Sequence, residues 1–576
     1  MNILGITGQD RDAAAALVCD GAVIAAIEEE KLSRIRHIGM DYAGGLPERA
    51  ITFCLERGGI GFDELDYVAY YLEPYKLFHR EIAFYSSLAM DTPSTSPFES
   101  FPNYFVDSLN GLRQRLRTRA MGEARLSKRG QFVDVNHQLA HAASAFYASG
   151  FERSAILALN NRGDMTSTAL MTGEGERIEI QAEVSFPHSL GMVYSAVTAV
   201  LGFGFVDDWH KAMWLSSTGE PEFPVLFKKL VFVGPGGMPE VDLDYFDLSQ
   251  RGQVSLGERF FREAGVTLRG KDDPITQKHR NIAASLQSRV EDVLCEVATR
   301  HRERTREENL CLAGGVALNG LANSAIERRS GYKRLFVQPA AGNAGCAIGS
   351  ALYVWHQVLG NKDRVYSMWH AFLGPQYNEE EIKNVLDNCK LGYEYFLTEE
   401  KLVTEVARLI ESGRIVGWFR GAMEFGPRTL GARSILASPI SEVTGDNLNV
   451  YIKQREDFRP FSAAVPEERE SEFFEQSNLT PFLQGVSRVR AGKESLIPAA
   501  VFGNGQVRVQ SVDRKTNPSF WKLLVKFGEL TGVPILLNTS FNLFGEPVVS
   551  TPREAVRGFY CSGIDCLAIG NFLVKK

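Results

Sequence analysis

The first 30 residues restrict the fold of this chain more than any other segment. The segments "NILGITG", "DAAAALVC" and "DGAVIAAIEEE" follow one another with only short polar breaks, which is the pattern of consecutive β-strands. Asp20 and Gly21 stand between the second and third segments, and this dipeptide is typical of a two-residue hairpin turn. We therefore predict a three-stranded meander at the start of the chain.

The size and composition of the chain restrict its class. Its 576 residues exceed what one hydrophobic core normally supports, so at least two domains are expected. Apolar residues make up 44% and charged residues 23%, as in a globular α/β enzyme, and the net charge of −7 gives no reason to expect nucleic-acid binding. The eight cysteines lack CxxC pairs and no apolar run could span a membrane, so we expect a cytoplasmic protein with reduced thiols.

Two glycine-rich turns each follow an apolar strand and precede a helix. The segment "LCLAGGVALNG" contains Gly314, Gly315 and Asn319, and the segment "QPAAGNAGCAIGSAL" contains Asn343. Backbone N–H groups in such turns can approach phosphates, so these residues are candidates for nucleotide binding. Together with the N-terminal meander, the turns resemble the ATPase fold of actin, sugar kinases and Hsp70.

Changes in periodicity indicate where the chain divides. The polar, proline-containing stretch 90–104 is expected to be a surface excursion. After about residue 357 the sequence "LGNKDRVYSMWHAFLGPQYNEEE" loses its periodicity and is expected to be a linker. We therefore expect an N-terminal domain over residues 1–360 and a second α/β domain over residues 372–576.

His137 and His141 are the first candidate metal ligands. They lie four residues apart in "NHQLAHAASAFYAS", which we expect to be a helix. At this spacing two imidazoles project from one face and can bind one cation. The alternative is an amphipathic helix that simply carries two polar residues.

The C-terminal part of the chain carries cations in turn-like sequence. The segments "GWFRGAMEFGPRTLGARSIL" and "YIKQREDFRPFSAAV" place them beside Gly, Phe and Pro, whereas a solvated basic face would alternate them with acids. Since the arginine fork suits phosphate groups, we interpret them as anion-binding residues, with an internal salt-bridge network as the alternative. The candidates are Arg420, Arg428, Arg433, Lys453, Arg455, Arg459 and Arg508.

A later apolar segment, "GVPILLNTSFNLFGEPVV", ends in small polar residues. Their hydroxyl and amide groups suit hydrogen bonding to phosphate or ribose. These candidates are Asn538, Thr539, Ser540 and Asn542.

These segments together resemble the ATP-dependent carbamoyltransferases of nodulation factors, cephamycin-type β-lactams, aminoglycosides and saxitoxin-like metabolites. The similarity covers nearly the whole chain and includes "DAAAALVCDGAVIAAIEEEKLSR", "MEFGPRTLGARSIL" and "YIKQREDFRPF". It implies an ATPase-type N-terminal domain, similar to the universal tRNA-threonylcarbamoylation protein, and a YrdC-like C-terminal domain. It also implies that the C-terminal domain makes carbamoyl adenylate from carbamoyl phosphate and ATP, with Mg²⁺, and that the N-terminal domain passes the carbamoyl group to a hydroxyl or amine.

The resemblance extends to single residues of the C-terminal domain. Lys453 and Arg455 match the family's KxR element, and Ser540 with Asn542 matches its SxN element. The resemblance implies catalytic roles for Lys453, Arg455 and Arg428. It also implies phosphate-binding roles for the remaining arginines, namely Arg420, Arg433, Arg459 and Arg508.

The N-terminal domain departs from the family at its metal site. Asn160 and Asn343 stand where the family has two metal-binding aspartates. An asparagine still offers a carbonyl oxygen but adds no charge, so we predict weakened binding of Fe or Zn by His137 and His141. Asp164, four residues beyond Asn160, is an alternative anionic ligand.

Arg11 stands where the family has an early histidine that is its candidate catalytic base. A guanidinium stays protonated near neutral pH, so Arg11 is kept as a candidate catalytic residue with altered chemistry.

Three functions are consistent with this sequence. The first is an ATP-dependent carbamoyltransferase of specialised metabolism, such as antibiotic or other natural-product biosynthesis. The second is an adenylate-forming amide or urea ligase, and the third is a non-catalytic nucleotide-binding partner protein. The identity of the acceptor and the oligomeric state, including a homo-oligomer, stay open.

Overall fold

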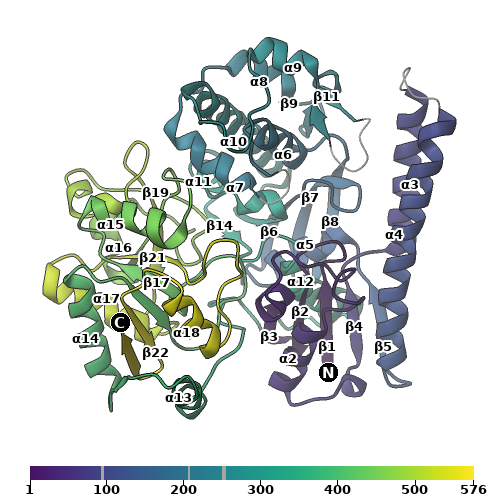
Figure 1. Cartoon of the computed structure of the whole chain (residues 1–576). Helices are drawn as coiled ribbons and strands as arrows, with labels where there is room; N and C mark the ends of the chain where they lie inside the picture. Colours follow the sequence, from purple (N-terminus) through teal and green to yellow (C-terminus); the bar gives the residue numbers. More distant parts are fainter. Residues whose placement is uncertain (92–96, 205–207, 249–253) are drawn as a thin grey trace. The chain divides into compact units, whose positions relative to one another are not determined.

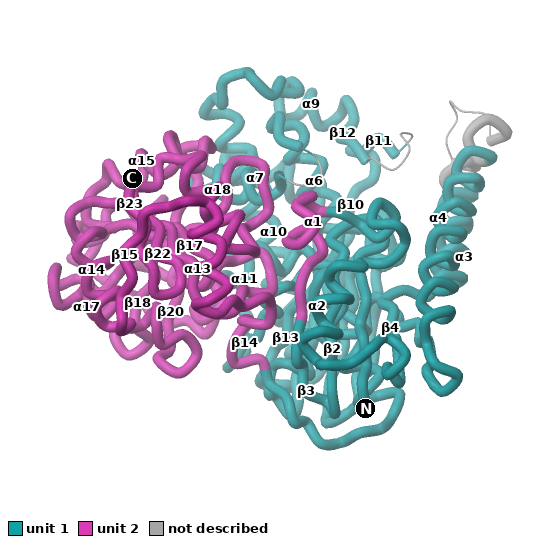
Figure 2. The backbone as a smooth tube through the Cα atoms, turned by 60° about the horizontal axis from the view of Figure 1, so that its bottom comes forward, with its two compact units in different colours: residues 1–25, 38–367 teal, residues 26–37, 368–576 magenta. Residues whose placement is uncertain are grey.

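The chain divides into two compact units. The computed structural model describes residues 1–91, 97–204, 208–248 and 254–576. One unit contains residues 1–25 and 38–367, and the other contains residues 26–37 and 368–576 (Figure 2). The boundary near residue 367 falls inside the expected linker, whereas the sequence did not indicate that residues 26–37 belong to the second unit. The functions assigned above to the two domains stay predictions.

The first sheet of unit 1 contains the predicted meander. Its strand order is β3-β2-β1-β4-β5, with β1 antiparallel to β2 and parallel to β4. Asp20 and Gly21 have φ values of 48° and 82°, the left-handed conformation that a two-residue turn of this kind requires. The strands are β1 (Asn2–Thr7), β2 (Ala14–Cys19), β3 (Ala22–Glu28), β4 (Tyr67–Tyr70) and β5 (Gln131–Asp134).

The second sheet of unit 1 repeats the topology of the first. Its order is β8-β7-β6-β13-β14, and its central strand β6 is again antiparallel to one neighbour and parallel to the other. The strands are β6 (Arg153–Leu159), β7 (Thr166–Glu174), β8 (Arg177–Ser185), β13 (Asn309–Ala313) and β14 (Arg334–Val337). The predicted mixed α/β fold is thereby confirmed. Two short hairpins complete the strands: β9 (Val231–Val233) with β10 (Pro239–Val241), and β11 (Phe246–Asp247) with β12 (Ser255–Leu256).

Helices α5 (His137–Phe146) and α12 (Gly345–Tyr353) pack closely against each other (Figure 1). Each follows the last strand of its sheet, β5 or β14. A Cβ atom on Gly349 would lie 1.9 Å from the carbonyl oxygen of Ala140, and one on Gly5 would lie 1.8 Å from that of Ala347. Only glycine therefore allows α12 to approach both α5 and β1.

Unit 1 has nine further helices in its described residues, and two of them form a pair of their own (Figure 1). Helices α3 and α4 lie side by side, and α4 begins at Pro97, so much of the stretch expected to be a surface excursion is helical, while residues 92–96 lie outside the described residues. The helices are α2 (Glu48–Gly58), α3 (Pro74–Asp91), α4 (Pro97–Arg125), α6 (Leu190–Val200), α7 (Trp209–Leu215), α8 (Pro224–Leu230), α9 (Glu258–Ala264), α10 (Gln277–Thr305) and α11 (Gly320–Arg329).

Unit 2 is built on one nine-stranded sheet of order β15-β23-β22-β16-β17-β21-β18-β20-β19. Two large clusters of buried apolar residues lie in its core, one around Phe541 and Leu567 and one around Trp418 and Phe520, beside a smaller cluster that contains Leu430 and Leu483. The strands are β15 (Glu394–Tyr395), β16 (Val416–Phe419), β17 (Arg433–Ala437), β18 (Ser462–Pro466), β19 (Ser487–Arg488), β20 (Gln506–Val512), β21 (Leu536–Ser540), β22 (Cys566–Ile569) and β23 (Phe572–Lys575). The helices are α1 (Glu29–Ser33), α13 (Glu379–Asn388), α14 (Glu399–Glu411), α15 (Glu442–Asn447), α16 (Glu470–Phe473), α17 (Pro518–Thr531) and α18 (Pro552–Tyr560).

Buried carboxylates fix the turn that follows β16. Glu424 accepts hydrogen bonds from the main-chain N–H groups of Leu430 and Ala432, at 2.7 and 2.8 Å. Lys31, in the segment 26–37, pairs with Glu28 at 2.8 Å and donates to the carbonyl oxygen of Glu424 at 2.9 Å. These contacts hold the loop "EFGPRTLGAR" in one conformation.

All eight cysteines carry free thiols, five of them buried. Across the described ranges, we find no helix that combines the length and the apolar character needed to cross a membrane.

We predict that Gly349→Ala destabilises unit 1. The new methyl group meets the backbone of α5, and overpacking of this kind costs about 1–3 kcal/mol or more, although alanine is the better helix former. Calorimetric unfolding checks this expectation. The control is Gly392→Ala, because nothing lies within 4 Å of a Cβ at that position, and equal stability of the two variants would contradict the prediction.

Candidate functional site

The KxR and SxN elements meet in unit 2. A π-helical turn over Leu448–Lys453 ends at Gln454, which has a left-handed φ of 44°, and this geometry directs Lys453 toward the end of β21. The Lys453 Nζ atom donates to the carbonyl oxygen of Ser540 at 2.8 Å and to Oδ1 of Asn542 at 2.7 Å. Lys453 thus contacts two residues that lie 87 and 89 positions further along the chain.

Arg455 lies beside Lys453 and is held by neutral groups. Its Nε donates to Oδ1 of Asn449 at 2.6 Å, and its guanidinium lies 4.6 Å from the ring centre of Phe461. Asn449 also donates to the carbonyl oxygen of Arg459 at 3.3 Å, so one amide orients both arginines. Neither contact supplies a negative charge.

Five cations of unit 2 are close enough to affect one another. Burial lowers the pKa of Lys453 well below its usual value, and Arg455 and Arg459 lower it further. Burial also lowers the pKa of Arg428 to about 10, again with a contribution from Arg459. For Arg508 the pKa falls well below its usual value because of burial and then three neighbours, Arg428, Arg455 and Arg459.

We call this group the cation cluster: Arg428, Lys453, Arg455, Arg459 and Arg508. Glu456 reaches it with one oxygen 3.8 Å from Arg459. The Nε of Arg428 is buried without a hydrogen-bond partner among the described residues. Cations that lie this close together and are shielded from water attract a polyanion.

The sheet positions the polar residues of β21 around the cluster. Ser462 of β18 pairs with Arg508 of β20 on one side and with Asn538 of β21 on the other. Asn538 donates to Gln510 at 2.7 Å, and its Oδ1 is buried without a partner in the described part of the chain. Thr539 stands between Asn538 and Ser540 in the strand, so its side chain points to the opposite face of the sheet.

A cavity of about 460 Å³ in unit 2 continues from this face. Gln510, the partner of Asn538, lines it. Its apolar wall contains Trp369, Phe372 and Phe482. The cavity therefore offers aromatic stacking surfaces and, at Gln510, a residue that is hydrogen-bonded to Asn538.

Arg420 and Arg433 lie among structural contacts of their own. Arg420 pairs with Glu399 at 3.1 Å. Arg433 is fully buried, donates to the carbonyl oxygens of Gly421 and Pro375 at 3.0 and 2.9 Å, and stacks 3.8 Å from the Phe419 ring centre. Both arginines thus have internal partners, and their predicted phosphate-binding role stays a prediction.

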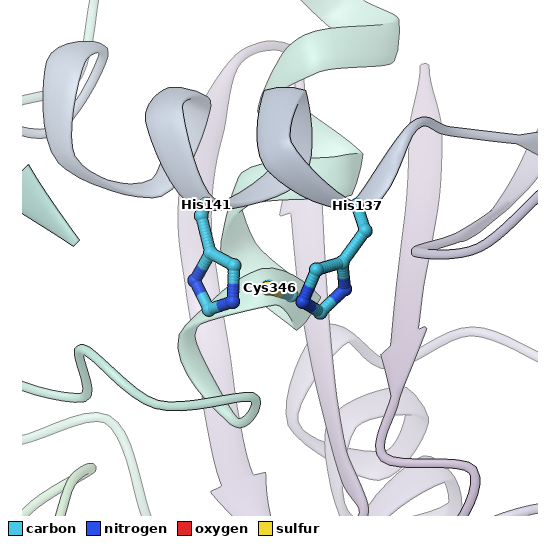
Figure 3. A group of neighbouring side chains, drawn as sticks. All are labelled: His137, His141 and Cys346. Atoms are coloured by element: carbon cyan, nitrogen blue, oxygen red, sulfur yellow. The ribbon is translucent and has the colours of Figure 1, made fainter. Parts of the chain in front are cut away.

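In unit 1, the predicted histidine pair gains a third neighbour, Cys346. His137 and His141 project from the same face of α5, and Cys346 is the second residue of α12 (Figure 3). One ligand atom from each of the three lies within 4.8 Å of the others, and all three residues are buried. The sequence analysis missed Cys346, although its place directly after the Asn343 turn was an available signal.

Burial keeps both imidazoles neutral. It lowers the pKa of His137, against opposing effects of Asp164 and the Tyr71 main chain, and it lowers the pKa of His141 well below its usual value. Burial also raises the pKa of the Cys346 thiol well above its usual value. Neutral imidazoles are the form that binds metal ions.

The alternative acid and one of the two asparagines are held by other contacts. Asp164 pairs with Arg80 at 2.7 Å and accepts from Gln138 at 3.4 Å, so the structure places it outside the histidine–cysteine group. Asn160 donates to Gln138 at 3.2 Å and accepts from the N–H of Gly315 at 3.3 Å. Both ends of the Asn160 amide are thus in use.

The predicted nucleotide-binding residues of the two glycine-rich turns differ in how much of their surroundings is filled by protein. A Cβ on Gly315 would meet nothing within 4 Å, so the backbone there is open to approach. A Cβ on Gly314 would lie 2.2 Å from the carbonyl oxygen of Leu159, so the backbone there is closely packed. Asn319 caps α11 and bonds to Gln287, which is a structural role. The main-chain carbonyl of Asn343 accepts from Thr7 at 2.9 Å.

Arg11 is partly exposed, with 27% of its side chain accessible. Its Nε forms an ion pair with Asp12 at 3.1 Å. The predicted catalytic role of Arg11 stays a prediction.

Two family models match the chain. "Carbamoyltransferase N-terminus" matches residues 2–352, and "Carbamoyltransferase C-terminus" matches residues 407–576. The Nodulation protein NolNO of Sinorhizobium fredii is 35% identical over 569 residues, which cover 98% of this chain and 79% of that protein. An uncharacterized protein of Synechocystis sp. is 35% identical over 603 residues, covering 100% of this chain and 97% of the relative.

The similarity to solved structures is lower. The crystal structure of HypF from T. kodakarensis aligns with a TM-score of 0.32 and 14% identity, over 63% of this chain and 49% of that one. An alignment with this TM-score does not establish a shared fold.

We predict that polyphosphate binding takes up a proton at Lys453. The lowered pKa of Lys453 rises when an anion binds, so affinity for ATP falls as the pH rises past the pKa of the free lysine. By the same linkage, the unliganded unit gains stability with rising pH in that window, because its unfolded state binds more protons. Titration calorimetry with ATP in two mildly alkaline buffers of different ionisation enthalpy measures the uptake, and uptake that persists unchanged in Lys453→Met would contradict the assignment.

We also predict that Arg428→Met stabilises the unliganded protein while weakening ATP binding. Replacing a buried cation beside other cations by an apolar side chain raises stability on the order of 1 kcal/mol. Urea unfolding with and without ATP checks both effects. Arg414→Met is the control, since Arg414 is 59% exposed and paired with Asp565, and such a change alters stability little.

Proposed function

The chain belongs to the carbamoyltransferase family, and we propose that it is an ATP-dependent carbamoyltransferase of specialised metabolism. In this proposal unit 2 makes carbamoyl adenylate from carbamoyl phosphate and ATP. In unit 1 the hydroxyl or amine of a small-molecule acceptor then bonds to the carbamoyl carbon, the bond from that carbon to the phosphate oxygen breaks, AMP leaves and the acceptor's proton goes to solvent. The relatives named for nodulation favour an acceptor from a specialised pathway.

The observation that carries the proposal is the cation cluster with Lys453 fixed against Ser540 and Asn542. Carbamoyl phosphate and ATP together bring four phosphoryl groups into one site, and ATP enters as its Mg²⁺ complex. Lys453 supplies a compact charge and the arginines supply forked donors. Anion binding relieves the mutual repulsion of the cluster, so the binding energy is greatest for the most highly charged species.

In the first step of the proposed reaction, water bonds to the phosphorus of carbamoyl phosphate and the bond from that phosphorus to the carbamate oxygen breaks, which gives phosphate and carbamate. A carbamate oxygen then bonds to the α-phosphorus of ATP while the bond from that phosphorus to the bridging oxygen breaks, and pyrophosphate leaves. Positive side chains aimed at the departing pyrophosphate stabilise the charge that develops there.

We assign the adenosine part of ATP to the cavity beside Gln510. Its aromatic wall, Trp369, Phe372 and Phe482, offers stacking surfaces for a base. The volume of about 460 Å³ exceeds the space that a nucleoside fills. In unit 1, the repeated strand order of the two sheets supports the ATPase-type domain that the sequence implies.

The second candidate, an amide or urea ligase, rests on the altered polar residues of unit 1. Asn160, Asn343 and Arg11 replace the acids and the base expected for carbamoyl transfer, so the adenylate made in unit 2 could meet another nucleophile. Acid specificity separates the two functions. Pyrophosphate release that requires carbamoyl phosphate supports the carbamoyltransferase, whereas equal release with a carboxylic acid supports the ligase.

The purified protein is expected to release pyrophosphate from ATP only when carbamoyl phosphate is present. Lys453→Ala and Arg455→Ala each lower this rate by more than about 100-fold, because each removes a charge that stabilises the leaving group. Arg469→Ala is the matched control, since Arg469 is 43% exposed and paired with Glu472. No release with carbamoyl phosphate or any acid would favour the non-catalytic partner protein, and full activity of the Lys453 or Arg455 variants would contradict the proposed site.

A further inference from the structure

A short segment from the start of the sequence, residues 26–37, belongs to unit 2 and contacts two of its loops. The Nζ atom of Lys31 donates to the carbonyl oxygens of Glu424 and Gly426, both at 2.9 Å. Glu28 accepts from the main-chain N–H of Gly426 at 2.8 Å. Since Arg428 follows Gly426 by two residues, these contacts fix the loop that carries one member of the cation cluster.

Arg34 of the same segment holds the second loop, residues 541–550. Its Nη1 atom donates to the carbonyl oxygen of Val548 at 2.6 Å, and its Nη2 atom donates to that of Pro547 at 2.7 Å. The tip of this loop lies in solvent, because Phe544 is 67% exposed, so contacts at the base of the loop decide its path. The rigid arginine fork fixes two successive carbonyl groups there.

This loop leads directly to the lysine of the cation cluster. The Nδ2 atom of Asn542 donates to the carbonyl oxygen of Glu546 at 2.6 Å, and Glu546 is the residue before Pro547. The Oδ1 atom of the same amide accepts from Lys453 at 2.7 Å. One end of the Asn542 side chain therefore bonds to the loop that Arg34 holds, and the other end orients Lys453.

The backbone of Arg34 indicates that its side chain is needed at this position. Arg34 ends helix α1 with a left-handed φ of 67°, and its N–H donates to the carbonyl oxygen of Glu30 at 2.9 Å. Glycine is the usual residue at such a helix end, because this conformation is unfavourable for a residue with a Cβ atom. The contacts of the arginine side chain outweigh this disadvantage.

We propose that Arg34 is a positioning residue of the anion site in unit 2. By holding the base of the loop 541–550, it fixes the amide of Asn542 and thereby directs Lys453 toward the bound polyphosphate. The inference rests on the proposed function, because it takes the cation cluster as the phosphate-binding site. It adds a residue that lies more than 400 positions before Lys453 in the sequence.

The test measures binding of inorganic triphosphate to the full chain by titration calorimetry. Arg34→Met is expected to weaken binding about 10-fold, as is typical when a contact behind a ligand-binding residue is lost. Asn542→Ala weakens binding as well. If Arg34 acts through Asn542, the double variant binds no more weakly than Asn542→Ala alone, whereas independent effects multiply.

The matched control is Arg557→Met. Arg557 contacts the same loop, but it is 56% exposed and pairs with the carboxylate of Glu546 rather than with the main chain. An exposed pair of this kind contributes little, so we expect triphosphate affinity within about twofold of the wild type. The fitted stoichiometry reports the folded fraction, so loss of folded protein is separated from loss of affinity.

Arg34→Lys is the second variant if Arg34→Met does not fold. It keeps the charge and the apolar stem but loses the planar fork, so the same non-additivity with Asn542→Ala is expected from a smaller single effect. Wild-type affinity in both Arg34 variants would overturn the proposal. Effects of Arg34 and Asn542 that multiply in the double variant would overturn it as well.

Failure of the proposed function is a separate result. Triphosphate binding requires no catalysis, so a wild-type protein that binds triphosphate but releases no pyrophosphate contradicts the reaction and leaves the coupling of Arg34 to Asn542 measurable. Absence of triphosphate binding by the wild type would overturn the positioning role, whether or not pyrophosphate is released.

Discussion

The crossing of α5 and α12 is the contact on which unit 1 depends. These helices follow the last strands of two sheets with the same order, so their packing joins the two repeats of the topology. At Gly349 and Gly5 the backbones come closer than any side chain would allow. Close packing of this kind leaves little freedom to shift, and it is what brings residues 137, 141 and 346 together.

In unit 2, the main constraint is that like charges are held close together. Its two large apolar clusters and the buried contacts of Glu424 and Glu28 make the scaffold rigid. On this scaffold, Lys453 and Arg455 bond to amide and carbonyl oxygens, and the other arginines of the cation cluster lie close to them. The repulsion that remains is a preference for an anionic ligand, and this links the fold directly to the chemistry of a carbamoyltransferase.

The sequence predicted those features that local chemistry controls. The Asp20–Gly21 turn, the meander and the helix with the histidine pair are all present, because turn residues and periodicity act over short segments. The internal contacts of Arg420 and Arg433 could not be predicted from the sequence. Their sequence surroundings resemble those of Arg428, yet Arg420 finds Glu399, and Arg433 finds main-chain oxygens that no local pattern reveals.

The sequence by itself determined the mixed α/β class, the family, and the residue types that carry charge and bind metal. Only the tertiary structure decided which of these residues act together. In β21, the side chain of Thr539 points to the face opposite those of Asn538 and Ser540. Asp164 forms an ion pair with Arg80, and Cys346 lies beside His137 and His141. The physical reason is that a side chain's partners come from elements far apart in the sequence, and their distances are fixed by how closely backbones can pack.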